Sequence, residues 1–131
     1  MIDIIAELKP IGGLFTAGSY DDALVQLEQL WEKIPTPKEN TLNSYLIVSS
    51  GVAIALKATL LDKAWEWAHR GLPYSGNFNL AGESEFLVAE VAYARADYAT
   101  AIKYFKIVKR VSGTRLFKNK DPKYRQLIDK V

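Results

Sequence analysis

The residues of this chain that could do chemistry are one histidine and a short run of glutamates. His69 is the only histidine, and Glu83, Glu85 and Glu90 follow it. A histidine can act as a general base or bind a metal, and two carboxylates across a cleft can hydrolyse glycosides. Both chemistries need partners, but the chain has no cysteine, no second histidine and no serine motif to supply them. Acids near a helix start, and a histidine near a helix end, complement the helix dipole. We therefore predict no enzyme, catalytic residue, metal or cofactor.

Positive charge gathers at the C-terminal end. Residues 101–131 hold 10 Lys/Arg and 2 Asp/Glu, whereas residues 1–100 hold 7 and 13. Phe117 and Tyr124 are interleaved with these cations, as is typical of nucleic-acid sites. The predicted basic patch comprises Lys103, Lys106, Arg110, Arg115, Lys118, Lys120, Lys123 and Arg125. The alternative is a solvated face that balances the acidic remainder of the chain.

A turn that occurs three times indicates how these residues are positioned. Its copies end at Ala23, Ala64 and Ala101, which are 41 and 37 residues apart. Amphipathic helical patterns precede and follow each copy. Recurrence at such a period is typical of helical solenoids, whose repeats bury their faces against each other.

The hydrophobic periodicity predicts seven helices, at about 2–17, 20–34, 41–59, 61–70, 81–95, 98–111 and 122–130. Pro10 predicts a kink or break in the first. The segments 74–80 and 114–120 are predicted loops. Asp121 and Pro122 are an N-cap and a first-turn proline for the last helix, which we expect to cap the stack. The predicted fold is an all-α, single-domain solenoid of three antiparallel helix hairpins, about 2–35, 41–73 and 82–112, with a C-terminal capping helix.

Over residues 2–111 the chain resembles the tetratricopeptide repeat family. The first repeat matches through Gly18, Tyr20, Asp21, Ala23, Leu24 and Pro35. The third matches through Tyr93, Asp97, Tyr98, Ala101, Ile102 and Phe105. The second departs from the pattern, with Thr59 for the glycine, Leu61 for the aromatic and Gly76 for the closing proline. Small alanines at these positions fit close helix crossings, where a larger side chain would overpack.

The resemblance implies a concave groove that holds a peptide or protein segment. By alignment its lining would be Leu46, Ser49, Ala53, Lys57, Glu83, Phe86, Glu90 and Tyr93. The basic clamp with which some family members bind a terminal carboxylate is not matched. Acidic and aromatic side chains favour a basic or apolar partner instead.

The sequence therefore predicts a non-enzymatic protein–protein interaction module, or adaptor. One alternative is a bacterial immunity protein that neutralises a basic toxin, since small helical-repeat proteins resembling this one accompany toxins. Another is nucleic-acid binding through the basic patch. Head-to-tail self-association of the basic end with acidic repeats is also conceivable. The absence of cysteine, of a signal peptide and of a long apolar run favours a cytoplasmic location without membrane contact.

Overall fold

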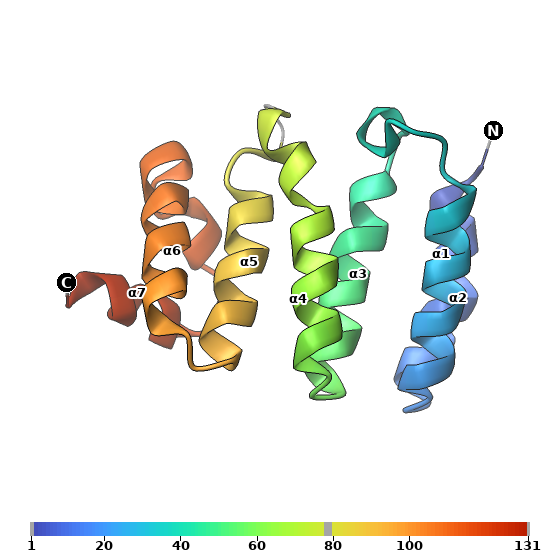
Figure 1. Ribbon diagram of the computed structural model, residues 1–131, viewed down its shortest axis with the longest axis horizontal. Coiled ribbons are helices and arrows are strands. Elements are labelled where there is room, and N and C mark those ends of the chain that lie inside the picture. Colours follow the sequence, from blue (N-terminus) through green and yellow to red (C-terminus); the bar gives the residue numbers. More distant parts are fainter. Residues whose placement is uncertain (1, 78–79, 131) are drawn as a thin grey trace. The chain divides into compact units, whose positions relative to one another are not determined.

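All regular secondary structure in the computed structural model is helical over the residues it describes, 2–77 and 80–130 (Figure 1). This confirms the all-α prediction. The α-helices are α1 (Ile4–Thr16), α2 (Tyr20–Lys33), α3 (Ser44–Lys57), α4 (Leu61–Arg70), α5 (Glu83–Ala94), α6 (Tyr98–Ser112) and α7 (Pro122–Asp129). The described residues also include the 3-10 helices η1 (Lys38–Asn40), η2 (Leu72–Gly76) and η4 (Arg115–Phe117). No helix in the described ranges is both long and apolar enough to span a bilayer.

The chain divides into two compact units, Met1–Trp67 and Ala68–Val131. The first holds α1, α2, α3 and most of α4, and the second holds the end of α4 with α5, α6 and α7. The boundary falls inside α4, and hence inside the predicted middle hairpin. A solenoid of three hairpins in a single domain remains a prediction.

The three predicted turns share one backbone geometry. Each has a residue with positive φ five positions before the recurring alanine: Gly18 at 80°, Thr59 at 56° and Ala96 at 61°. The next residue in each turn donates its N–H to the carbonyl five positions back, from Ser19 to Leu14, Leu60 to Ala55 and Asp97 to Ala92, at 2.8–2.9 Å. These are Schellman bonds, which satisfy orphan carbonyls at a helix end. The recurring alanines are fully buried. The repeated sequence therefore encodes a repeated turn.

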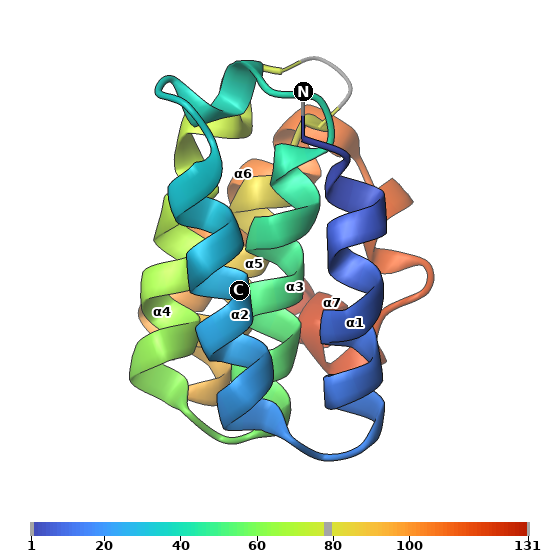
Figure 2. The same ribbon diagram turned by 90° about the vertical axis from the view of Figure 1, so that its right-hand side faces the viewer.

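In the first unit, α1, α2 and α3 lie side by side (Figures 1 and 2). Asp3 begins α1 by accepting a bond from the Ala6 N–H at 3.1 Å. Pro10 does not end this helix, which continues to Thr16, so a break at this position is wrong. The α2 stripe is buried as predicted at Leu24, Leu27 and Leu30.

An indole ring packed on a glycine closes the core of the first unit. Trp67 is 2% exposed and lies over Gly51 of α3, where an added Cβ would overlap the ring. Trp31 meets Trp67 edge to face, with ring centroids 6.0 Å apart. Only glycine leaves space for this approach. Lys38 extends over Trp31 and donates to the Trp31 carbonyl at 2.7 Å, which helps to close the end of α2.

In the second unit, α5 and α6 form a tight hairpin. Gly82 starts α5 at φ 84°, and its backbone approaches Ser112, whose hydroxyl donates to the Ala81 carbonyl. Asp121 caps α7 by accepting from the Lys123 N–H at 3.0 Å, with Pro122 in the first turn as predicted.

The two predicted loops are partly wrong, because each contains a short 3-10 helix. η2 extends to Gly76 within the predicted loop 74–80, and η4 lies within 114–120. Residues 78 and 79 of the first loop lie outside the described residues. Helix α3 ends at Lys57, two residues before its predicted end.

Candidate functional site

Arg115 to Lys130, which we call the C-terminal segment, packs on α5 and α6 within the second unit (Figure 1). It comprises η4, a short connection and α7. Phe117 and Ile128 are its buried anchors, at 6% and 7% exposure. Most of its other side chains are exposed. The segment is thus held by a few apolar residues and by the contacts described next.

An aromatic cluster joins the C-terminal segment to the hairpin. Phe86 of α5 meets Phe117 and Tyr124 edge to face, with centroids 5.2 and 5.9 Å apart. Phe105 of α6 contacts the same two rings at 5.6 and 5.3 Å. Tyr93, about two turns after Phe86 on α5, meets Tyr124 with ring centroids 5.3 Å apart. The edge-to-face pairs among them add specific geometry to the burial of apolar area.

A carboxylate lies within this aromatic surface. The Glu90 side chain is only 15% exposed, and its Oε1 is 3.8 Å from Nζ of Lys120. Burial raises the pKa of Glu90, and the charges of Lys120 and Lys123 partly offset the rise. A desolvated carboxylate favours a nearby cation much more than an exposed one does. Glu90 is therefore suited to select for positive charge.

The two lysines also lie over aromatic rings. Lys120 Nζ is 5.5 Å from the centroid of Phe86, and Lys123 Nζ is 5.1 Å from that of Tyr93 and 5.3 Å from that of Tyr124. These distances are in the range of cation–π attraction. The face of α5 formed by Phe86, Glu90 and Tyr93, which we call the α5 face, thus holds two ammonium groups between one carboxylate and several rings.

Tyr124 remains a neutral donor in this setting. Burial, followed by the charges of Glu90 and Asp121 and by Tyr93, raises its pKa to about 12. Its phenol therefore keeps its proton throughout the ordinary pH range. The charged side chains of the site are Glu90, Asp121 and the two lysines.

The predicted groove residues fall in different units. Leu46, Ser49 and Lys57, with Ala53, are on α3 in the first unit, while Glu83, Phe86, Glu90 and Tyr93 are on α5 in the second. On α3, Leu46 is 39% exposed and the Ser49 hydroxyl donates to its carbonyl at 3.2 Å. On α5, Phe86 is only 3% exposed, because the C-terminal segment covers it. The structure brings Phe86, Glu90 and Tyr93 together, and Glu83 is partly buried at the start of the helix.

The cations of the predicted basic patch are all exposed: Lys103, Lys106, Arg110, Arg115, Lys118, Lys120, Lys123 and Arg125. Lys120 and Lys123 also contact the α5 face, and Arg125 pairs with Asp129 at 3.7 Å. Phe117 is buried and Tyr124 packs into the aromatic cluster. Phe117 is therefore not accessible for stacking on a base, and Tyr124 is only partly accessible.

The residues that the sequence offers for chemistry lie on α4 and α5. His69 is partly buried in the last turn of α4. Glu85 is 9% exposed and accepts a long bond of 3.4 Å from the Ser84 hydroxyl. Within the described ranges no three His, Cys, Asp or Glu side chains gather in a way that could hold a metal. Trp65 is partly buried and Trp67 fully so, which leaves neither indole fully exposed.

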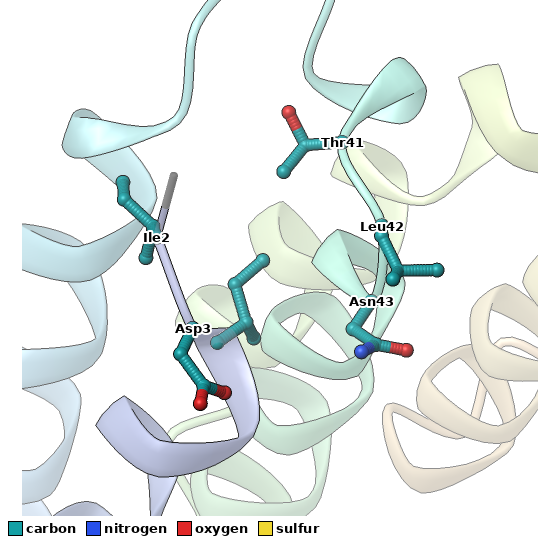
Figure 3. A pocket seen from close by; sticks show the side chains of 6 residues that line it. Ile2, Asp3, Thr41, Leu42 and Asn43 are labelled. Atoms are coloured by element: carbon teal, nitrogen blue, oxygen red, sulfur yellow. The ribbon is translucent and has the colours of Figure 1, made fainter.

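A pocket of about 290 Å³ lies in the first unit, between the start of α1 and the residues before α3 (Figure 3). Its lining is Ile2, Asp3, Ile4, Thr41, Leu42 and Asn43. The Asp3 carboxylate is already used to cap α1, and Leu42 is 76% exposed. The sequence did not indicate this pocket, because it depends on how two distant segments meet. Its lining is largely apolar, and its polar side chains do not form a recognisable catalytic or metal-binding set.

Comparison of the chain with models of protein families, with curated proteins and with solved structures gave no match. The resemblance to tetratricopeptide repeats thus rests only on the residues quoted for it.

Proposed function

We propose that this protein is a non-enzymatic protein–protein interaction module whose α5 face binds a segment of a partner through aromatic and lysine side chains. One observation carries the proposal: the α5 face already holds such a segment, the chain's own C-terminal segment, through Glu90 and the aromatic cluster. Buried aromatic anchors next to a desolvated charge are typical of binding hot spots.

Glu90 is the strongest single reason to regard the α5 face as a binding site. A buried ion pair is weak support for stability, because desolvation offsets much of the attraction. A leucine at this position would pack in the aromatic core without the desolvation penalty of a carboxylate. An ionisable group here contributes selectivity for a cation, which is what a binding face needs.

The nature of the partner follows from the occupant that is seen. The partner would offer aromatic rings and lysines rather than a terminal carboxylate, in keeping with the basic or apolar partner that the sequence predicts. A toxin-neutralising immunity protein is a special case, in which the bound segment belongs to a basic toxin.

Selection from a displayed peptide library tests this function. The full-length chain should enrich peptides that combine lysine with Phe or Tyr. Glu90→Gln should lose the lysine preference and keep the aromatic one, while Glu66→Gln, an exposed acid of the first unit, should select as the wild type does. Enrichment of acidic peptides, or none above the bare support, would contradict the proposal.

Nucleic-acid binding is a second candidate, supported by the exposure of all eight cations of the basic patch. Because Phe117 is buried and Tyr124 packs into the aromatic cluster, such binding would depend mainly on phosphate contacts, which weaken steeply as salt rises. If the affinity for an oligonucleotide, titrated from low to higher salt, does not change with salt concentration, this candidate is eliminated.

A further inference from the structure

We propose that the C-terminal segment is a displaceable, autoinhibitory occupant of the α5 face, and that a partner segment of the same chemistry displaces it. This inference rests on the proposed function and names both the regulation and the partner. The partner motif read from the chain is an aromatic residue, lysines three and six positions later, and an aromatic residue at seven, as in Phe117, Lys120, Lys123 and Tyr124.

The contacts of the C-terminal segment are specific but weak. Lys120 is 47% exposed and lies 3.8 Å from Glu90, a geometry in which an ion pair adds little net stability. Lys123 also faces its own cap, Asp121, at 4.0 Å. The cation–π contacts of partly exposed lysines are of similar small size. The polar part of the attachment therefore selects an occupant without holding it tightly.

The segment is also built to detach locally. Helix α7 has eight residues, fewer than an isolated helix needs for stability in water. Gly113 precedes the segment at φ 62°, with open space around it, and supplies a joint between α6 and η4. Short, exposed terminal elements have among the lowest free energies of local unfolding in a protein.

Detachment alone is unfavourable, because it exposes aromatic rings of the α5–α6 hairpin that the C-terminal segment helps to bury. Phe86 and Phe105 are 3% and 0% exposed with the segment in place. Both would meet water if the segment left and nothing replaced it. Exchange therefore favours an incoming segment that brings its own aromatic rings. This is why the occupant of the opened face is a segment with this motif rather than any cationic peptide.

Tethering explains how a weak segment can compete. A segment joined by a short connection has an effective concentration of about millimolar at its own site. A separate partner molecule can bind only the proteins whose α5 face is open. Its apparent Kd is therefore its intrinsic Kd divided by the open fraction. Weakening the segment's own contacts should therefore strengthen partner binding.

The test compares two full-length variants with the wild type. Lys120→Gln with Lys123→Gln weakens the contacts to the α5 face. Lys106→Gln with Lys118→Gln removes the same charge from two other exposed positions. The probe is a fluorescein-labelled peptide with the sequence of residues 114–130, followed by anisotropy. We expect about fivefold tighter binding by the first variant, if the open fraction rises from about a tenth to a half, and wild-type binding by the second.

Each outcome decides something different. Equal affinity of the first variant and the wild type overturns displacement and leaves the proposed function standing. No peptide binding by any of the three proteins overturns both. If the first variant instead forms dimers that exclude the peptide, the occupant is a second copy of the chain and the proposed partner is wrong.

Hydrogen exchange on the wild type gives a readout that needs no variant. Excess unlabelled peptide should speed exchange of the α7 amides as the segment is displaced. A peptide that binds while α7 keeps its full protection would lie elsewhere on the protein, which would also overturn the inference.

Discussion

The two units close their cores with aromatic rings in different ways. In the first unit, Trp67 packs on Gly51 and Trp31, and the nearby cation, Lys38, lies over Trp31 and donates to backbone carbonyls. In the second unit, Phe86 and Phe105 share their cluster with Glu90 and two lysines. A lysine that satisfies carbonyls at a helix end serves stability, whereas a desolvated carboxylate gives up stability for selectivity. This difference is why we place the binding site in the second unit.

The largest effect should come from removing the ring at the centre of the second cluster. Phe105→Ala should lower the free energy of unfolding by about 4 kcal/mol, because a fully buried ring that contacts Phe86, Phe117 and Tyr124 leaves a cavity. Urea denaturation measures the loss. Tyr104→Ala, at a partly exposed position on the same helix, should cost about 1 kcal/mol. Similar losses in both variants would mean that the cluster is not a core.

The next effect tests the glycine in the first unit. Gly51→Ala should cost about 2 kcal/mol, because the new methyl group overlaps the Trp67 ring and must displace it. Gly12→Ala is the matched control, since its Cβ would meet open space within α1. There the change should add about 0.5–1 kcal/mol through helix propensity. A loss of stability at position 51 no larger than that at position 12 would show that the Trp67 ring does not pack on Gly51 as described.

The sequence predicted the α-helices and the repeated turns, but it missed the short 3-10 helices and the contacts of the site. Recurrence of small, polar and apolar residues predicted three turns, including the one where Thr59 replaces glycine and still adopts positive φ. The pairing of Lys120 with Glu90 was not predicted, because it joins residues 30 positions apart through tertiary packing. Its one signal was the opposite charge of the two parts of the chain. Periodicity also placed Phe117 in a loop, where its burial could not be read from a helical pattern.

The smallest effect concerns pH and the buried acid. Burial makes Glu90 bind its proton more tightly in the folded chain than in the unfolded one, although Lys120 and Lys123 act against this. Ionised Glu90 therefore opposes folding at neutral pH, and this penalty fades as pH falls through the raised pKa towards the ordinary value of 4.5. Glu90→Gln should raise the urea midpoint slightly at pH 7 and less at pH 5. The partly exposed Lys120 can rehydrate, which limits any loss from its missing partner.

Glu66→Gln, at an exposed acid of the first unit, is the control for this pH series and should shift the midpoint little at either pH. A Glu90→Gln protein that is less stable than the wild type at pH 7 would mean that its ion pair outweighs its desolvation. Glu90 would then be part of the stabilising core, and the contrast between the two units would be lost.

The most direct test of recognition by the α5 face is a double-mutant cycle across the site. The chain carrying Lys120→Gln and Lys123→Gln, with and without Glu90→Gln, is titrated with the 114–130 peptide, with and without Lys120→Gln in the peptide. We predict a coupling free energy of about 1 kcal/mol between Glu90 and the peptide lysine. Losses that add to within about 0.3 kcal/mol would show that the carboxylate does not select the cation, and would contradict the account.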